Sequence, residues 1–336
     1  PPEAADRPTR GAAGGHFDAA ALSQVFLEPL PPEPMKLRLT MLLAVLLPWA
    51  CAEAREQTLR LPAGPSGTLQ VTAWTPDTAA PGRLPVIVFS HGLHGCAVQA
   101  RFLTQGLANA GYLVFAPNHR DASCNGGTTP WFEGTELMFL HPDQWTEATY
   151  RNRADDVRRV VAGLYDDDRF RGRADWSRLG LAGHSLGGYT VLGLAGGWAG
   201  WKLPGVKAVL ALAPYSHPYD YRQTIGNLAA PVMYQCGQND FAITPQVSQL
   251  SYAASPQPKY YVEMANAGHF AWTDRDATAH RPILAYAVAF FDHYLKGQAG
   301  PLLTQALPGV SQLRYASELG NSEPQQQAPA TDAPAP

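Results

Sequence analysis

The segment Gly183–Gly188 (GHSLGG) follows the apolar run Arg178–Ala182 and constrains the fold more than any other part of the sequence. A G-x-S-x-G pattern behind a short apolar strand indicates a sharp strand-to-helix turn, because glycine lacks the Cβ atom that would clash there. Such a turn exposes Ser185 at the carboxyl end of the strand. The amide of Leu186 would begin the helix, whose positive end favours a developing negative charge. The pattern therefore predicts a nucleophilic serine with an amide donor beside it.

Strand and helix patterns alternate on both sides of this turn. A last helical pattern opens at Arg281-Pro282 and ends at Lys296-Gly297. The alternation predicts an α/β fold with a mostly parallel, twisted sheet of about eight strands and helices on both faces. At 336 residues and 46% hydrophobic content, the chain can build one such domain of roughly 250 residues. The predicted strands are Thr58 to Leu61, Thr68 to Thr75, Leu84 to Phe89, Tyr112 to Ala116, Arg178 to Ala182, Lys207 to Ala213, Pro231 to Cys236 and Lys259 to Met264.

The amino-terminal part of the sequence has the features of an export signal. Lys36 and Arg38 precede the apolar stretch 39–47, and Ala52-Glu53-Ala54 offers small residues for cleavage. We therefore expect a signal peptide at 35–54 and a periplasmic or secreted protein without a transmembrane segment. The alternative of a buried helix is disfavoured by Pro48.

The predicted domain organisation follows from these boundaries. Residues 1–34 precede Met35 and are expected to be translated upstream sequence, and 55–320 form the α/β domain. Residues 321–336 are rich in Pro, Gln and Ala and are expected to be disordered. Lipid attachment at Cys51 is disfavoured because Pro48-Trp49-Ala50 lacks the residues that usually precede a lipidated cysteine.

The charge and the cysteine content limit which binding partners and which cellular compartment are expected. The formal net charge is −3, so no basic surface argues for nucleic acid or for an anionic membrane. In an oxidising compartment, a Cys96 to Cys124 bridge would join two loops beside the expected site, although the spacing does not fix this pairing. Cys236 lies in a strand pattern and is expected to be a small buried hydrophobe.

A nucleophilic serine needs a general base within hydrogen-bond reach, and the base needs an acid that fixes its tautomer. In folds built on this turn the chain order is serine, acid, histidine. Asp240 lies 55 residues after Ser185, and His269 lies 29 residues after Asp240; each follows a predicted strand. We predict Asp240 as the acid and His269 as the base. The rivals are Asp220, which stays a serious competitor, and Asp274, Asp276, His217, His280 and His293.

A second amide donor is expected from the loop Phe89–Gly95, which follows the first central strand. Its glycines let the backbone approach a bound substrate, and the amide of Leu93 is the best candidate to join that of Leu186. Losing one such donor typically costs about 10² to 10³ in rate. His91 and His94 could be read as metal ligands, but no third ligand is evident. Structural polar contacts are preferred, and neither a metal nor another cofactor is expected.

The segment from Asp121 to Trp145 is long for a loop in a compact domain, which indicates function or mobility. Trp131, Phe132 and Met138 are predicted to wall a substrate pocket. A hydrophobic plug over the core explains these side chains equally well. The segment Tyr215 to Tyr221 is a second candidate wall.

With these motifs placed, the chain from about Leu84 to Lys296 resembles the α/β-hydrolases grouped as predicted dienelactone hydrolases, close to the type II platelet-activating factor acetylhydrolases. The resemblance implies Ser185 as nucleophile, His269 as base, and the amides of Leu93 and Leu186 as oxyanion donors. The motifs that carry it are Val86–Leu93, Asn118–Asp121, Arg153–Val157, Gly183–Tyr189 and Ala267–Phe270.

The sequence differs from both enzyme families at catalytic positions. Dienelactone hydrolases carry cysteine where this chain has Ser185, which puts lactone specificity in doubt. The acetylhydrolases place their acid after the strand that here ends at Ala211–Pro214, where no Asp stands. Asp240 matches the commoner position in the wider group, which includes polyester hydrolases and cutinase-like enzymes. The resemblance to these two families therefore does not predict the substrate.

These observations together predict an exported serine hydrolase that cleaves carboxylic esters through an acyl-enzyme. Its substrate would be a short-chain ester, a lipid acyl ester or a polyester. An amidase or peptidase of the same fold is an alternative within enzymes. The alternative outside enzymes is a non-catalytic binding protein of the cell envelope that uses the same pocket.

Overall fold

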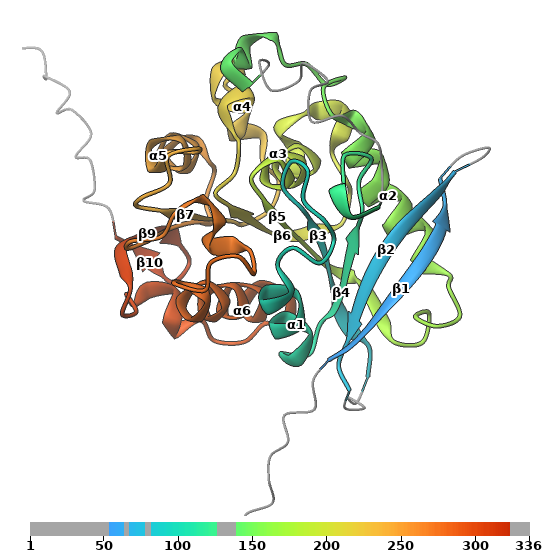
Figure 1. The fold of residues 1–336 in the computed structure, drawn as a ribbon. Coiled ribbons are helices and arrows are strands. Elements are labelled where there is room, and N and C mark those ends of the chain that lie inside the picture. The colour runs from blue at the N-terminus through green and yellow to red at the C-terminus, as the bar shows by residue number, and fades with distance from the viewer. Residues whose placement is uncertain (1–53, 64–66, 78–81, 126–138, 323–336) are drawn as a thin grey trace, which may run out of the picture. The chain divides into compact units, whose positions relative to one another are not determined.

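The computed structural model describes residues 54–63, 67–77, 82–125 and 139–322, and within them one mixed sheet runs through the molecule (Figure 1). Its strand order is β1-β2-β4-β3-β5-β6-β7-β8-β9-β10. Strands β3 to β8 are parallel to one another, whereas β1, β2, β9 and β10 pair antiparallel at the two edges. The strands are β1 Arg55–Pro62, β2 Thr68–Thr75, β3 Leu84–Ser90, β4 Leu113–Pro117, β5 Ala174–His184, β6 Val206–Leu212, β7 Val232–Gly237, β8 Lys259–Met264, β9 Val310–Ser317 and β10 Gly320–Asn321.

Helices cover both faces of this sheet, as the alternating pattern predicts (Figure 1). Helices α1 and α6 share one hydrophobic cluster on one face, and α2, α3, α4 and α5 contribute to the cluster on the other. The central strands are covered on both faces, and every residue of β3 is buried. The helices are α1 Arg101–Asn109, α2 Arg151–Tyr165, α3 Leu186–Leu192, α4 His217–Arg222, α5 Pro245–Ala254 and α6 His280–Lys296.

The predicted α/β fold with a mostly parallel sheet is confirmed, and two strands were missed. The sheet has ten strands in place of about eight, because β9 pairs antiparallel with β8 and β10 pairs with β9. Most residues of β9 are half-buried or exposed, so its sequence shows no continuous apolar run. The sheet therefore extends to Asn321, one residue past the expected domain end.

Several predictions fall outside the described residues. They concern residues 1–34, the signal peptide, lipid attachment at Cys51, most of the carboxyl-terminal tail, and the pocket residues Trp131, Phe132 and Met138. In the described part of the chain, no helix has both the length and the apolar content needed to cross a membrane.

Candidate active site

Ser185 stands in a strained turn between β5 and α3. Its backbone has φ 55° and ψ −116°, in the left-handed half of conformational space that non-glycine residues rarely adopt. Two contacts hold the turn: the Ser185 amide donates to the Leu212 carbonyl at 2.9 Å, and the Ser185 carbonyl accepts from the Tyr215 amide at 3.1 Å. The following strand β6 therefore fixes the conformation that lifts the hydroxyl out of the sheet.

The two glycines of the motif are required by close backbone approach. A Cβ atom on Gly183 would lie 2.2 Å from the carbonyl oxygen of Gly187, and one on Gly187 would lie 1.9 Å from the carbonyl oxygen of Ser90. Real Cβ atoms essentially never approach backbone oxygen so closely. These positions let β3, β5 and α3 meet directly behind Ser185.

His269 lies between the other two residues singled out by the sequence. Its Nε2 atom is 3.0 Å from Ser185 Oγ, and its Nδ1 atom is 2.7 Å from Asp240 Oδ2. Residues from the carboxyl ends of β5, β7 and β8 thus form one hydrogen-bonded chain. This arrangement can transfer a proton from a serine hydroxyl to an imidazole that a carboxylate orients.

The Asp240 carboxylate is held on both of its oxygens. Oδ1 accepts the backbone amides of Ala242 and Ile243 at 2.9 and 2.8 Å, which leaves Oδ2 for His269. Its side chain has no exposed surface, whereas that of His269 is 10% exposed. The acid is buried and fixed, and the base faces the site.

The rival residues have other partners. Asp274 accepts the amides of Arg101 and Phe102 at the start of α1, and Asp220 accepts hydrogen bonds from Ser216 and Ser251. Asp276 holds the amide of Thr278. Of the histidines, His280 bonds to the Thr273 carbonyl, His293 pairs with Glu318, and His217 packs on Tyr215.

The expected oxyanion donors, the amides of Leu93 and Leu186, belong to the loop after β3 and to the start of α3. Leu186 is the first residue of α3, where a helix amide has no intrahelical acceptor. The loop that contains Leu93 passes close by, since a Cβ atom on Gly92 would lie 3.5 Å from Ser185 Cβ. The structure therefore brings the Gly92 backbone, which precedes Leu93, beside the serine.

A buried polar cluster beneath this loop was not assigned a role from the sequence. Arg153, on the first turn of α2, pairs with Asp121 at 2.6 Å and donates to the carbonyls of His91 and Gly92. His119 lies beside them and bonds to Ser90 and to Asp156. The cluster links β3, β4 and α2 under the nucleophile.

Electrostatics in this cluster are dominated by burial and by the Arg153 charge. Both effects lower the pKa of His91 and of His119 well below the usual range, so both imidazoles are neutral. Burial alone would raise the pKa of Asp121, but the charge and hydrogen bonds of Arg153, together with His91 and His119, hold that pKa well below its ordinary value. The cluster therefore contains the ion pair of Arg153 with Asp121, and Asp156 pairs with Arg159 at 2.9 Å.

His184, which precedes the nucleophile, supports the base. Its Nε2 atom lies 2.9 Å from the His269 carbonyl, and Gln99 contacts its Nδ1 atom at 3.1 Å. Burial and the neighbouring His269 lower the pKa of His184 well below its usual range. A neutral His184 therefore fixes the backbone of His269 without adding a charge beside it.

Three of the cysteines lie in the described residues. Cys96 and Cys124 form a disulfide that joins the Gly92–Leu93 loop to the segment after β4. Cys236 is free and buried in β7.

The described part of the long loop packs into an aromatic cluster. Phe139 and Trp145 contact Tyr215 at ring-centroid distances of 4.8 and 4.9 Å, and Trp145 also packs on Tyr189 of α3. The Tyr215 hydroxyl donates to the Phe139 carbonyl at 2.7 Å. At these residues the loop closes over the core as a plug, and Leu140 beside them is 74% exposed.

Among residues 54–63, 67–77, 82–125 and 139–322, no group of three or more potential ligands is arranged to hold a metal ion. Both ring nitrogens of His91 lie within hydrogen-bond distance of backbone groups, namely the Gly92 carbonyl and the His119 amide. This agrees with the interpretation of His91 as a structural residue.

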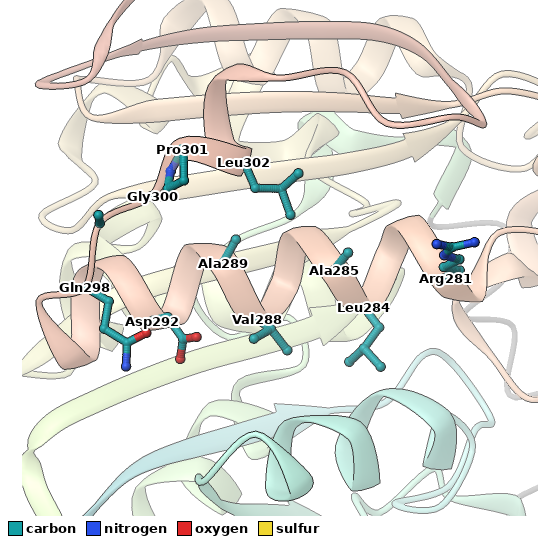
Figure 2. Close-up of a pocket in the computed structure, with 11 residues that line it drawn as sticks. Arg281, Leu284, Ala285, Val288, Ala289, Asp292, Gln298, Gly300, Pro301 and Leu302 are labelled. Carbon is teal, nitrogen blue, oxygen red and sulfur yellow. The ribbon is translucent and has the colours of Figure 1, made fainter. Parts of the chain in front are cut away.

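An apolar groove is lined by α6 and the segment that follows it (Figure 2). Leu284 and Val288 line it from the helix, and Pro301 and Leu302 from the turn that follows. None of its lining residues belongs to the Ser185 site, so the groove is separate from the chemistry.

Comparison with protein families gave two matches. A model described as PET hydrolase-like matches residues 142–299, which contain Ser185, Asp240 and His269. A model of platelet-activating factor acetylhydrolase, isoform II, matches residues 63–134, which contain the Gly92–Leu93 loop. No curated protein gave a significant match to the chain. Because both families comprise ester hydrolases, the fold and these matches identify the chain as a carboxylic-ester hydrolase of the α/β-hydrolase type, similar to the dienelactone hydrolase and type II acetylhydrolase group.

Proposed function

We propose that this protein hydrolyses uncharged carboxylic esters through an acyl-enzyme on Ser185. The observation that carries the proposal is the position of His269, within 3.0 Å of the Ser185 hydroxyl and 2.7 Å of the Asp240 carboxylate. His269 takes the proton from Ser185 as Oγ bonds to the ester carbonyl carbon. It then gives this proton to the departing alcohol.

The second half of the reaction uses the same groups. A water molecule gives its proton to His269 and attacks the acyl carbon, the bond to Ser185 Oγ breaks, and His269 returns the proton to that oxygen. The amides of Leu93 and Leu186 bind the negative carbonyl oxygen in both tetrahedral intermediates. Asp240 stabilises the positive imidazole throughout.

An apolar ester fits the surroundings of these residues. Phe241, next to Asp240, is 84% exposed, and Phe270, next to His269, is 45% exposed. Exposed aromatic side chains beside the triad can hold the apolar part of a substrate. The PET hydrolase-like match over 142–299 agrees with this, and short-chain esters, lipid acyl esters and polyesters are the three substrates to compare.

The test is Ser185→Ala measured against p-nitrophenyl esters of graded acyl length. We expect loss of turnover with an unchanged melting temperature, and labelling of the wild type by a fluorophosphonate at Ser185. A short-sn-2 phospholipid and a polyester film, assayed alongside, separate the three substrate classes. Retained esterase activity in the Ser185→Ala variant would refute the proposal, and cleavage of matched amides at equal rate would favour an amidase.

We further propose that the protein is exported. The basic and apolar pattern of residues 35–54 supports this, and so does the Cys96–Cys124 disulfide, since disulfides persist in oxidising compartments. Amino-terminal sequencing of the protein recovered from its native host should begin near Arg55. A product that retains residues 1–34 would contradict this assignment.

A further inference from the structure

We propose that Arg153 is a positioning residue for the oxyanion hole. It fixes the peptide unit between Gly92 and Leu93, so that the Leu93 amide faces the developing charge at Ser185. This inference rests on the proposed function and assigns a role in it to a side chain of α2, which packs against β3 and β4 (Figure 1).

The Arg153 guanidinium divides its hydrogen bonds between a carboxylate and two neighbouring peptide groups. Nη1 donates to the His91 carbonyl at 2.7 Å, and Nη2 donates to the Gly92 carbonyl at 3.0 Å. Nε and Nη2 also donate to the two oxygens of Asp121 at 3.1 and 2.6 Å. The side chain has no exposed surface, so solvent does not compete for these bonds.

The Gly92 carbonyl and the Leu93 amide belong to the same peptide unit. In a planar trans peptide the C=O and N–H bonds point in opposite directions, so an anchored carbonyl sets the direction of the amide. Arg153 holds the carbonyl oxygen from within the core. The Leu93 amide is thereby turned away from Arg153, on a loop that passes directly beside Ser185.

A second donor reinforces the same carbonyl. The His119 amide lies 3.0 Å from His91 Nε2, so that nitrogen is an acceptor and the proton of the neutral ring is on Nδ1. His91 Nδ1 then donates to the Gly92 carbonyl at 2.7 Å. The Gly95 amide also donates to this carbonyl, at 3.0 Å. Three donors on one carbonyl polarise its peptide and make the attached N–H a stronger donor, because hydrogen bonds in series strengthen one another.

Asp121 completes the anchor at the other end of the loop. It neutralises Arg153 and accepts the backbone amide of His94 on Oδ2 at 3.1 Å. The pair therefore holds the loop on both sides of Leu93, through two carbonyls before it and one amide after it. A loop fixed in this way does not reorganise when charge develops, which is what an oxyanion hole requires.

Its position in α2 distinguishes Arg153 from an ordinary helix residue. Positions 153, 157, 160 and 164 form one buried stripe, and the other three are Val157, Val160 and Leu164. An apolar side chain at 153 would fill the stripe without the cost of burying a charge. The charged guanidinium instead donates hydrogen bonds to the carbonyls of the two peptide groups beside the nucleophile.

Arg153→Lys is the decisive variant, because one ammonium cannot reproduce the fork that reaches both carbonyls and Asp121. We expect kcat for a p-nitrophenyl ester to fall about 10- to 100-fold, below the roughly 10²- to 10³-fold loss of a whole donor. KM should change less than about threefold. Arg158→Lys is the matched control, since Arg158 lies on the same helix and donates to the Trp201 and Gly200 carbonyls, away from Leu93.

A trifluoromethyl ketone separates positioning from general structure. Ser185 Oγ adds to its carbonyl carbon and the hydroxyl proton moves to His269, which leaves a charged oxygen in the oxyanion hole. Its inhibition constant should rise in Arg153→Lys by the same factor as kcat falls, and should not change in Arg158→Lys. An unchanged kcat, or a loss no larger than the drop in folded fraction, overturns the inference.

Amide NMR of the wild type covers the case in which Arg153→Lys does not fold. The Leu93 amide proton should shift downfield and become protected when the trifluoromethyl ketone adds to Ser185. A shift at Leu186 with none at Leu93 overturns the inference while leaving the proposed function intact. If fluorophosphonate does not label Ser185 at all, the proposed function itself fails.

Discussion

The carboxylate of Asp240 lies 2.7 Å from Nδ1 of His269, whereas that of Asp220, which follows the neighbouring strand β6, binds the hydroxyls of Ser216 and Ser251. The two carboxylates therefore differ in their partners and in burial, since Asp240 is buried and Asp220 is half-buried. Asp240→Asn should lower kcat steeply, because the amide favours the wrong tautomer of His269. In serine hydrolases with this arrangement the corresponding loss is about 10⁴-fold.

Asp220→Asn is the matched control for that experiment. Its kcat at neutral pH should stay within about twofold of the wild type when rates are corrected for the folded fraction. A steep loss in Asp220→Asn together with a mild one in Asp240→Asn would reverse the assignment of the acid.

Gly187→Ala should prevent the turn at Ser185 from forming. The new Cβ atom would lie 1.9 Å from the Ser90 carbonyl oxygen, and backbone cannot yield as a flexible side chain does. We expect little folded protein and no activity, whereas Gly172→Ala should behave as wild type because nothing lies within 4 Å of the added atom. Circular dichroism and ester hydrolysis measure both variants, and an active Gly187→Ala enzyme would contradict the geometry.

Loss of the Cys96–Cys124 disulfide should affect stability and rate together. The bridge closes a separation of 28 residues, and native disulfides of this kind contribute about 2 to 4 kcal/mol to the free energy of unfolding. It also ends in the loop that carries Leu93, so kcat of the Cys96→Ala/Cys124→Ala variant should fall more than KM changes. Denaturation curves and kinetics at 25 °C test this, with Cys236→Ala as the single-thiol control; a stability loss with wild-type kcat would show that the bridge does not order the loop.

Asp220 should make stability depend on pH. Burial raises the pKa of Asp220 from 3.8 to about 6, so the folded state favours the protonated carboxyl. Its contribution is complete below about pH 4 and is lost as pH rises through 6, by at most about 3 kcal/mol. The unfolding free energy of Asp220→Asn should therefore decline less between pH 4 and pH 7, and parallel curves for the two proteins would count against this burial effect.

Most of the sheet could be predicted because its central strands are covered on both faces. A continuous apolar run such as Leu84 to Phe89 is visible without any tertiary information. β9 was missed because most of its residues are half-buried or exposed, so it carries no such run. Its pairing with β8 depends on the chain that returns after α6, which no local pattern shows.

Ser185, Asp240 and His269 could be selected because each follows a strand of a parallel sheet, and the ends of such strands share one edge. The pairing of Cys96 with Cys124 could be suggested but not fixed. Arg153 was missed as a functional residue, although a signal was present: it is a charge at an apolar position of the stripe that continues through Val157, Val160 and Leu164. Where such a side chain would reach depends on the fold, since its partners at 91, 92 and 121 come from other elements.

The separations of 55 and 29 residues between Ser185, Asp240 and His269 have a consequence for the newly made chain. The three groups meet only after β5, β7 and β8 have joined one sheet, and contacts of such long range form late and slowly. An incompletely assembled chain therefore holds no hydrolytic centre. Ester cleavage is therefore a direct readout of finished folding.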